Sequence, residues 1–178
     1  MNFKKFKFKK IKSTNETAIR LIKKNKIKSG MVVAETQFKG KGQYGRKWIS
    51  YKGNLHVSFF HELSKKNFSI IRITKINCLL VRTLLSKYIK KKIIYKKPND
   101  LLIENKKISG ILQEIIFISK KVFLITGIGI NINKNPIIKK YPATNMCELT
   151  KKSINKVEVE NDLKQLFEKN LIKLKIIK

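Results

Sequence analysis

The sequence predicts an α+β fold, in which a mixed, largely antiparallel sheet is packed with helices. Hydrophobic residues make up 42% of the 178 residues, so the chain has a globular composition with enough material for one core. Short segments alternate apolar and polar residues as strands do, and three longer segments repeat apolar residues at helical spacing. Such elements form a layered α+β domain. We expect residues 1–178 to form a single domain, because no linker or internal repeat interrupts them.

Strands are predicted wherever apolar residues alternate or form a short run between turn residues. Phe6 and Phe8 share one face of the first strand, and Pro98 stops the fourth because proline cannot donate to a ladder. Turns are expected at residues 104–106 and 120–121, each inside a hairpin. In chain order, the predicted strands are residues 1–10, 31–35, 54–60, 93–96, 101–103, a short one around Ile108, 111–118 and 122–130.

Helices are predicted where apolar residues recur every three or four positions. Ser13 or Thr14 can cap the first helix, and Ser29-Gly30 ends it. Cys78 lies within the apolar pattern of the second helix, as a small core residue does. The predicted helices are residues 15–26, 68–90 and 158–175. The second takes its apolar face from Ile70, Ile71, Ile73, Ile76, Leu79, Leu80, Leu84 and Tyr88.

The net charge of +31 comes from 42 lysines and arginines against 11 acidic residues. Three explanations compete: nucleic-acid binding, attachment to a membrane surface through a basic amphipathic helix, and a compositional bias towards Lys, Ile and Asn. Lysine is spread along the whole sequence together with abundant Ile and Asn, so we favour compositional bias. In each case the field attracts anionic substrates.

The two cysteines, Cys78 and Cys147, are too few and too far apart for a zinc site or a disulfide framework. Free thiols are typical of the reducing cytoplasm. No apolar run approaches the roughly 20 residues of a membrane span. The first ten residues alternate Phe with Lys and lack the apolar core of a secretory signal. We therefore expect a cytoplasmic protein without membrane association.

The most informative segment is the glycine-rich run that leads to the chain's only tryptophan, Trp48. Without a Cβ, glycine lets backbone N–H groups approach a ligand, and consecutive amides in such a loop form an anion site. Cations and an indole face suit the phosphate and base of a nucleotide. On spacing alone a solvated basic turn is the alternative, since no strict phosphate-loop pattern is met. The run contains Lys39, Gly40, Lys41, Gly42, Gly45, Arg46 and Lys47.

Four other motifs accompany this run in a fixed order. They are Lys12-Ser-Thr-Asn15, then Lys96-Lys-Pro-Asn-Asp100, Lys107-Ile-Ser-Gly-Ile-Leu112 and Gly127-Ile-Gly-Ile-Asn131. In this order the five motifs resemble the catalytic domain of biotin protein ligases, over roughly residues 8 to 150. That family reads Ser-Thr-Asn, Gly-Arg-Gly-Arg-x-Gly-Arg-x-Trp, Lys-Trp-Pro-Asn-Asp, Lys-x-x-Gly-Ile-Leu and Gly-x-Gly-Ile-Asn.

The resemblance implies a biotin/lipoate ligase-like fold and an ATP-dependent ligase reaction in two steps. Biotin and ATP first form biotinyl-5'-AMP and pyrophosphate, and the biotinyl group then passes to a lysine of a biotin carrier protein. Lys96 is implied as the catalytic lysine between the biotin carboxylate and the α-phosphate, and Arg46 as a catalytic residue that binds phosphate. Biotin and ATP are the implied substrates and Mg²⁺ the implied metal, with Asp100 as its one weak candidate ligand.

The resemblance also assigns the remaining site residues. Ser13, Thr14 and Asn15 keep their second interpretation as a helix cap. Lys41 and Gln43 stand where the family often has arginine, and the neutral Gln43 implies a looser hold on the adenylate. The implied biotin-binding residues are Ser13, Thr14, Asn15, Gln37, Gly40, Lys41, Gly42, Gln43, Lys96 and Gly110. The implied nucleotide-binding residues are Arg46, Trp48, Asn99 and Asn131.

The implied partner is a biotin carrier domain of the acetyl-CoA carboxylase type. Because the Ser-Thr-Asn motif begins at Ser13 and the chain ends at Lys178, we expect neither the DNA-binding domain nor the C-terminal SH3-like domain of some relatives, and no specific DNA binding. The oligomeric state stays open. Two alternative functions also stay open: a lipoate or octanoate transferase of the same superfamily, and a non-catalytic basic protein that binds nucleic acid.

Overall fold

The computed structural model of the chain describes residues 2–63, 69–138 and 141–173. Every predicted strand and helix has a counterpart there, except that the two strands predicted around Ile108 and at 111–118 form the single strand β6. Residues 1, 68, 174 and 175, at the ends of predicted elements, lie outside the described residues. In chain order the elements are β1 (Lys5–Ile11), α1 (Thr14–Asn25), β2 (Ser29–Gln37), the single turn η1 (Gln43–Gly45), β3 (Leu55–Leu63), α2 (Ile70–Tyr88), β4 (Ile94–Lys96), β5 (Asp100–Ile103), β6 (Lys106–Ile118), β7 (Lys121–Ile130), α3 (Met146–Thr150) and α4 (Lys156–Lys173).

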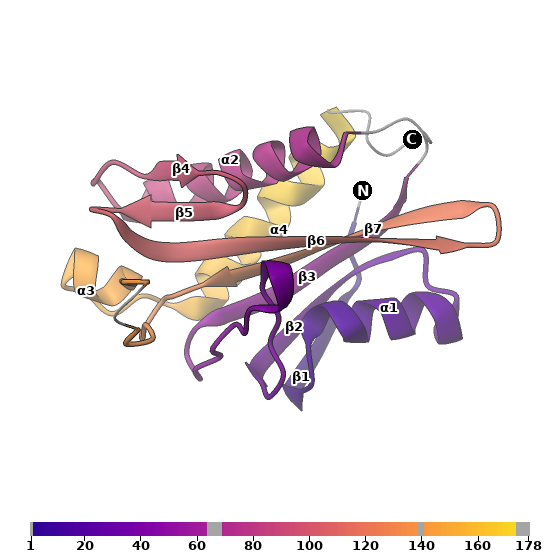
Figure 1. Cartoon of the computed structure of the whole chain (residues 1–178), viewed down its shortest axis with the longest axis horizontal. Helices are drawn as coiled ribbons and strands as arrows, with labels where there is room; N and C mark the ends of the chain where they lie inside the picture. The colour runs from indigo at the N-terminus through magenta and orange to yellow at the C-terminus, as the bar shows by residue number, and fades with distance from the viewer. Residues whose placement is uncertain (1, 64–68, 139–140, 174–178) are drawn as a thin grey trace.

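The strands form one sheet in the order β1-β2-β3-β7-β6-β5-β4. Among the described strands only β1 and β2 pair in parallel, and α1 connects them because parallel neighbours need a crossover. Figure 1 shows α1 on one face of the sheet and α2 with α4 on the other. The prediction of a mixed, largely antiparallel sheet packed with helices is confirmed.

Each face of the sheet has its own hydrophobic core. On the α2 and α4 face, Phe59 of β3 stacks on Phe167 of α4 with ring centroids 4.3 Å apart. On the opposite face, Ala18 and Ile22 of α1 pack against Phe60. With 12 residues, α1 is only about 18 Å long. The glycine-rich segment after β2 covers the part of this face that lies beyond the N-terminus of α1 (Figure 1).

The end of α1 differs from the prediction that Ser29-Gly30 terminates it. The helix ends at Asn25, and Lys26 turns the chain in the left-handed conformation with φ 53°. Ser29 and Gly30 already belong to β2. A Cβ on Gly30 would meet the rings of Phe6 and Phe60 within 3 Å. This glycine therefore serves core packing rather than helix termination.

The buried face of α2 also differs from its predicted apolar face. Ile70 and Ile71 are exposed, by 41% and 79%, whereas Val81 and Leu85 are fully buried. The reason is a polar contact between α2 and the sheet: Thr74 meets Gln113 of β6, and Asn77 Nδ2 lies 3.4 Å from Thr126 Oγ1 of β7. Thr74 and Asn77 therefore occupy part of the sheet-facing side of the first half of α2 together with the buried Ile73, and Ile70 and Ile71 face outwards. Cys78 is buried as predicted.

The short helix α3 is not predicted by periodicity, because five residues are too few to show a helical repeat. Its start nevertheless carries a capping signal. Asn145 Oδ1 accepts a hydrogen bond from the N–H of Glu148 at 2.8 Å, and Asn145 Nδ2 reaches the Glu148 carboxylate at 3.3 Å. This Asn-x-x-Glu arrangement is a variant of the capping box. It fixes the segment that follows β7 and borders the site.

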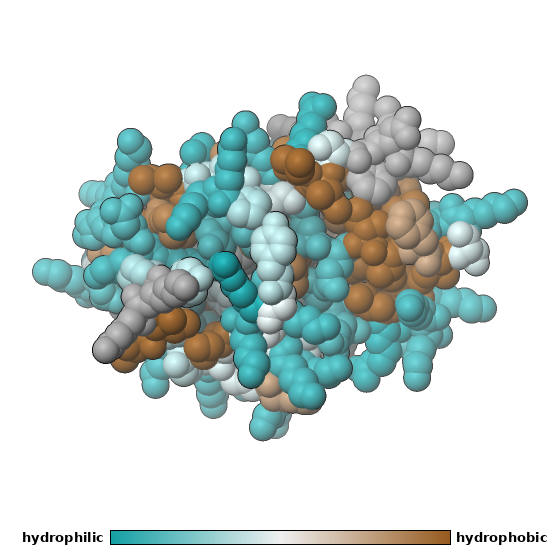
Figure 2. Space-filling model, in the orientation of Figure 1, coloured by the Kyte–Doolittle hydropathy of each residue, from teal (hydrophilic) through white to brown (hydrophobic). Residues whose placement is uncertain are grey.

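Hydrophilic side chains cover most of the face shown in Figure 2, and hydrophobic groups gather at the end where the β6–β7 hairpin turns. Phe117, 73% exposed, belongs to this hairpin. None of the described helices is both long enough and apolar enough to cross a membrane.

Candidate active site

A cavity of about 440 Å³ lies on the α1 face of the sheet, and we call it the main cavity. The N-terminus of α1, the glycine loop (residues 39–48), the β4–β5 turn and the middle of β6 and β7 meet there. Gly40 is the one predicted site residue that does not line it, because Gly40 packs under the backbone carbonyl of Trp48. The other predicted residues all line it: Ser13, Thr14, Asn15, Gln37, Lys41, Gly42, Gln43, Arg46, Trp48, Lys96, Asn99, Asp100, Gly110 and Asn131.

The floor of the main cavity contains Gly110, Gly127 and Gly129. These glycines leave space for the side chains of Asn15 and Trp48. A Cβ on Gly129 would overlap the indole of Trp48, and a Cβ on Gly110 would meet the same ring at 3.1 Å. A Cβ on Gly127 would overlap the carboxamide of Asn15. Glycine in a strand marks such close approaches. Gly127 and Gly129 are two residues apart on β7, so Asn15 and Trp48 occupy neighbouring places on the floor.

Trp48 is anchored by a buried histidine. Its Nε1 donates to His56 Nδ1 at 3.3 Å, and the other ring nitrogen of His56 faces the Tyr51 carbonyl at 3.2 Å. Burial lowers the pKa of His56 to about 4, so the ring is neutral at pH 7 and Nδ1 is free to accept. The second histidine, His61, lies on β3, which pairs with β2 on one side and β7 on the other. Burial lowers its pKa to about 4 as well.

These two histidines predict a loss of stability in acid. Between pH 4 and 6.5 the unfolded chain binds protons on both rings and the folded chain does not, so stability falls as the pH drops through this range. At about 1.4 kcal/mol per pKa unit, the expected loss from pH 7 to pH 5 is a few kcal/mol. Urea unfolding at the two pH values measures it. A His61→Gln variant should show a shallower dependence, and a wild type equally stable at both values would contradict the prediction.

The N-terminus of α1 is capped by a neighbour on β2. Ser13 occupies the N-cap position, as predicted, but its side chain makes no capping hydrogen bond. Gln37 Oε1 instead accepts from the Thr14 N–H at 2.7 Å and from the Thr14 hydroxyl at 3.1 Å. The hydroxyl of Ser13 and the amide nitrogen of Gln37 make no hydrogen bond among the described residues. Both therefore remain available to a ligand.

Asn15 holds three parts of the site together. Its Oδ1 accepts from Ser58 Oγ at 2.5 Å, while its Nδ2 donates to Glu114 Oε2 at 2.6 Å and lies 3.4 Å from the Leu112 carbonyl. Both amide hydrogens of Asn15 are thus directed at protein acceptors. Asn15 shapes the wall of the main cavity and has no amide hydrogen left to donate to a ligand.

Lys107 is a functional candidate that our sequence interpretation missed. Its Nζ lies 2.7 Å from Asp100 Oδ1 and 5.5 Å from the centre of the Trp48 ring, so it is held over the floor. Lys96, the predicted catalytic lysine, also lines the cavity, but its side chain is exposed and makes no ion pair with a described residue. Lys107 begins the Lys-x-x-Gly-Ile-Leu motif, and that signal was available in the sequence.

Two asparagines occupy the far wall. Asn99 is used by the protein, because its Nδ2 donates to the Ile111 carbonyl at 2.6 Å. Asn131 Nδ2 donates to the Thr144 carbonyl at 3.1 Å, whereas its buried Oδ1 has no partner among the described residues. A buried oxygen without a partner is costly unless something donates to it. Asn131 Oδ1 is therefore an acceptor available to a ligand.

The glycine loop forms a small hairpin that closes over the main cavity. The N–H of Gly42 donates to the Arg46 carbonyl at 2.7 Å, and the N–H of Trp48 donates to the Gly40 carbonyl at 3.0 Å. Tyr44 at its tip adopts φ 54°. Two side chains tie the hairpin to its surroundings: the Arg46 guanidinium lies 5.1 Å from the Tyr141 ring centre, and Lys41 Nζ lies 2.7 Å from Glu16 of α1.

Loss of the contact with α1 should loosen the loop. Lys41 lowers the pKa of Glu16 by a direct hydrogen bond, so the pair is ionised at neutral pH. Such a surface pair contributes at most about 1 kcal/mol, so Glu16→Gln should raise the rate of chymotrypsin cleavage after the exposed Tyr44 by up to about fivefold. Glu16 also pairs with Lys12 at 2.9 Å. The matched control Lys12→Gln keeps the contact between Lys41 and Glu16, and an equal rise in that variant would show that this contact does not hold the loop.

Comparison with known sequences places the chain in a family. Residues 7–131 match the Biotin/lipoate A/B protein ligase family. The chain is 33% identical to the bifunctional ligase/repressor BirA of Escherichia coli K12 over 125 residues, which cover 68% of this chain and 38% of that protein. It is 29% identical to BirA of Bacillus subtilis 168 over 167 residues, which cover 89% and 51%. The matched region thus spans about half or less of these curated relatives.

Solved structures agree with this match. The biotin protein ligase from Aquifex aeolicus in complex with biotin and ATP superposes with a TM-score of 0.80 at 34% identity, over 97% of this chain and 72% of that chain. The biotin protein ligase from Leishmania major in complex with biotin gives 0.77 at 26% identity, over 94% and 73%. The sequence match, the fold and the shared motifs around one cavity show that this chain belongs to the Biotin/lipoate A/B protein ligase family.

Proposed function

We propose that the chain activates biotin with ATP as biotinyl-5'-AMP and transfers the biotinyl group to a lysine of a carrier protein. The observation that carries this proposal is the main cavity, where residues from five separate sequence motifs meet. Uncharged donors and acceptors of Ser13, Thr14 and Gln37 suit the neutral ureido ring of biotin. An indole face and clustered cations on the same floor suit a nucleotide.

In the proposed first step a carboxylate oxygen of biotin attacks the α-phosphorus of ATP, the bond to the bridging oxygen breaks and pyrophosphate leaves. Negative charge grows on the phosphoryl oxygens, so a cation fixed in advance lowers the barrier. We assign this role to Lys107, which Asp100 and Trp48 hold in place, in preference to the exposed Lys96 of the sequence-based prediction. Arg46, tied to Tyr141 at the rim, is proposed to bind phosphate.

The proposed metal arrives with ATP. Among the described residues, no group of three or more His, Cys, Asp or Glu side chains is placed to hold a resident metal ion. Asp100 is the one carboxylate that lines the main cavity, and its Oδ1 already meets Lys107. Mg²⁺ usually keeps waters and takes one or two carboxylates beside substrate phosphates. The site fits MgATP as the substrate, with Asp100 as its single protein ligand.

The intact mass of a biotin-acceptor domain, of the acetyl-CoA carboxylase type that we propose as the partner, tests the function. We expect a gain of one biotinyl group after incubation with the chain, biotin, ATP and Mg²⁺. Lipoate is offered in parallel, because the matched family includes lipoate ligases, and a preference for lipoate would overturn the choice of biotin. No gain with either acid, and no acyl-AMP in the mixture, would contradict the proposal as a whole.

A further inference from the structure

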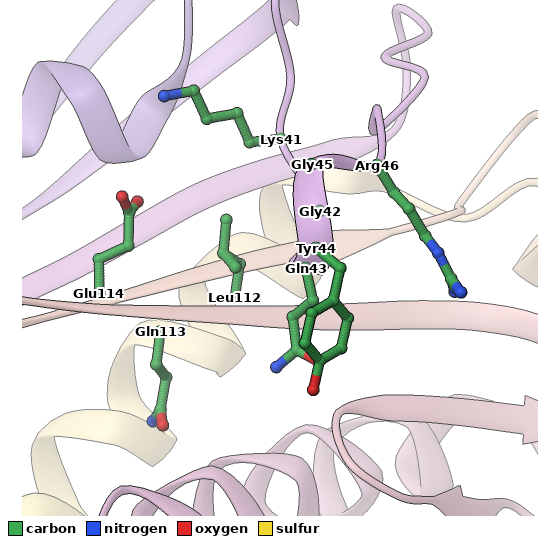
Figure 3. Close-up of a pocket in the computed structure, with 9 residues that line it drawn as sticks. All are labelled: Lys41, Gly42, Gln43, Tyr44, Gly45, Arg46, Leu112, Gln113 and Glu114. Carbon is green, nitrogen blue, oxygen red and sulfur yellow. The ribbon is translucent and has the colours of Figure 1, made fainter.

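A second pocket opens beside the main cavity, between the glycine loop and β6 (Figure 3). We call it the side pocket; its volume is about 520 Å³. It shares four loop residues, 41–44, as well as Arg46 and Leu112 with the main cavity, so the two spaces meet around the loop. It is lined by residues 41–46 of the loop and by Leu112, Gln113 and Glu114 of β6.

Glu114 stands where the two spaces meet. Figure 3 shows its carboxylate and Leu112 on the loop side of β6, whereas Gln113 points to the other side. Its Oε2 accepts from Asn15 Nδ2 at 2.6 Å, and Asn15 lines the main cavity. Glu114 is also the only acidic residue among the described residues that line the side pocket.

The charge of Glu114 is not neutralised by an ion pair. The nearby Lys41 ammonium turns to Glu16 at 2.7 Å, and no cation lies within 4 Å of Glu114 among the described residues. The carboxylate in the main cavity differs in this respect, since Asp100 is paired with Lys107 at 2.7 Å. The chain has a net charge of +31, so most of its surface repels cations. A pocket that holds an unpaired carboxylate differs from that surface, because the carboxylate attracts a cation.

We propose that the side pocket receives the acceptor lysine of the carrier, and that Glu114 binds its ammonium group and takes its proton. This inference rests on the proposed function and identifies the route by which the second substrate reaches the adenylate. A protonated lysine is not a nucleophile, so a proton acceptor within the pocket is required near neutral pH. Glu114 is the group that meets this requirement while touching the wall of the main cavity.

The lysine ammonium gives one proton to the Glu114 carboxylate, and the freed nitrogen attacks the carbonyl carbon of the acyl-adenylate. A carbon–nitrogen bond forms, the bond from that carbon to the phosphate oxygen breaks, and AMP leaves with the bonding electrons. The nitrogen loses its second proton to water as the amide forms, and Glu114 returns its proton to water.

The variant Glu114→Gln tests this role, because it keeps the shape and an oxygen that accepts from Asn15 but removes the charge. We expect transfer to the carrier to fall by about a hundredfold. Pyrophosphate release with biotin and ATP alone should change by less than about twofold. Capture of the adenylate by hydroxylamine, which is small and uncharged at pH 7, should also be unchanged. Equal losses with both nucleophiles would show that Glu114 only positions Asn15, and normal transfer would show that the side pocket is not the route.

The pH dependence of transfer and a control variant test the same role. The deficit of Glu114→Gln should shrink as the pH approaches 10, because the acceptor lysine then loses its proton unaided. A pH-independent deficit would argue against proton acceptance. The matched control is Glu62→Gln, which removes the carboxylate that pairs with Lys121 at 3.2 Å outside both cavities, and it should alter neither half-reaction. If the wild type makes no adenylate at all, the proposed function fails before this inference is tested.

Discussion

Replacing Lys107 by alanine is expected to lower adenylate formation by at least about a hundredfold, the usual effect of removing one preorganised charge stabiliser. Lys107 is fixed by Asp100 and Trp48 at the floor of the main cavity. Its side chain is not part of either hydrophobic core, so the fold should survive. Pyrophosphate release with biotin and ATP, without carrier, measures the effect, and thermal unfolding confirms that the variant is folded.

Lys96→Ala is the matched control, since Lys96 is a second lysine on the same cavity but with an exposed and unpaired side chain among the described residues. We expect a change of no more than about threefold, in keeping with a lysine that contributes only to the surrounding field. The opposite pattern, with a severe loss in Lys96→Ala and near-normal activity in Lys107→Ala, would restore the sequence-based assignment.

The second large effect is expected from Gly129→Ala. The added methyl group would occupy the place of the Trp48 indole, which cannot easily retreat because His56 holds its Nε1 and Gly40 holds its backbone N–H. Overpacking of this kind costs about 1–3 kcal/mol. If that cost falls on the proposed nucleotide-binding surface, KM for ATP should rise by about tenfold or more, while KM for biotin changes less. Initial rates at varied ATP and biotin separate the two.

The neighbouring glycines serve as controls for this prediction. Gly127→Ala meets Asn15 instead of Trp48, so it should raise KM for biotin more than KM for ATP. Gly110→Ala touches the flexible end of Lys107 and one edge of the indole, both at 3.1 Å, and should have a milder effect. Equal changes in both KM values for all three variants would contradict the assignment of the floor to two different substrates.

The sequence predicts most of the fold, because its strands are short alternating runs and its long helices show a clear repeat. It fails where a contact between distant segments decides burial. The first turns of α2 are an example: Thr74 and Asn77 face the sheet because Gln113 and Thr126 offer partners there, and no local pattern reveals this. Gly30 is another, since two phenylalanine rings from different strands determine why a glycine is needed.

At the site, too, local sequence patterns predict some features and contacts between distant segments decide others. The five motifs predict which segments line the main cavity, but not which polar groups the protein has already used. Asn15 and Asn99 are committed to protein partners, whereas Asn131 keeps a free oxygen. Lys107 and Lys96 each begin one of the five motifs, and only the ion pair of Lys107 with Asp100 and its position over Trp48 distinguish the two lysines. Tyr141 belongs to none of the five motifs.

The positive charge of the main cavity should affect how fast the reaction products leave the site. Within the described part of the chain, Asp100 is the one acidic residue that lines it. The basic residues that line it are Lys41, Arg46, Lys47, Lys96, Lys97 and Lys107. Such a surface attracts pyrophosphate and AMP as well as ATP. We therefore expect the release of pyrophosphate and AMP, rather than the chemical steps, to limit the turnover rate. Salt at 0.15 M screens charges that are more than about 8 Å apart. Moderate salt should then raise the turnover rate, and higher salt should weaken the binding of ATP.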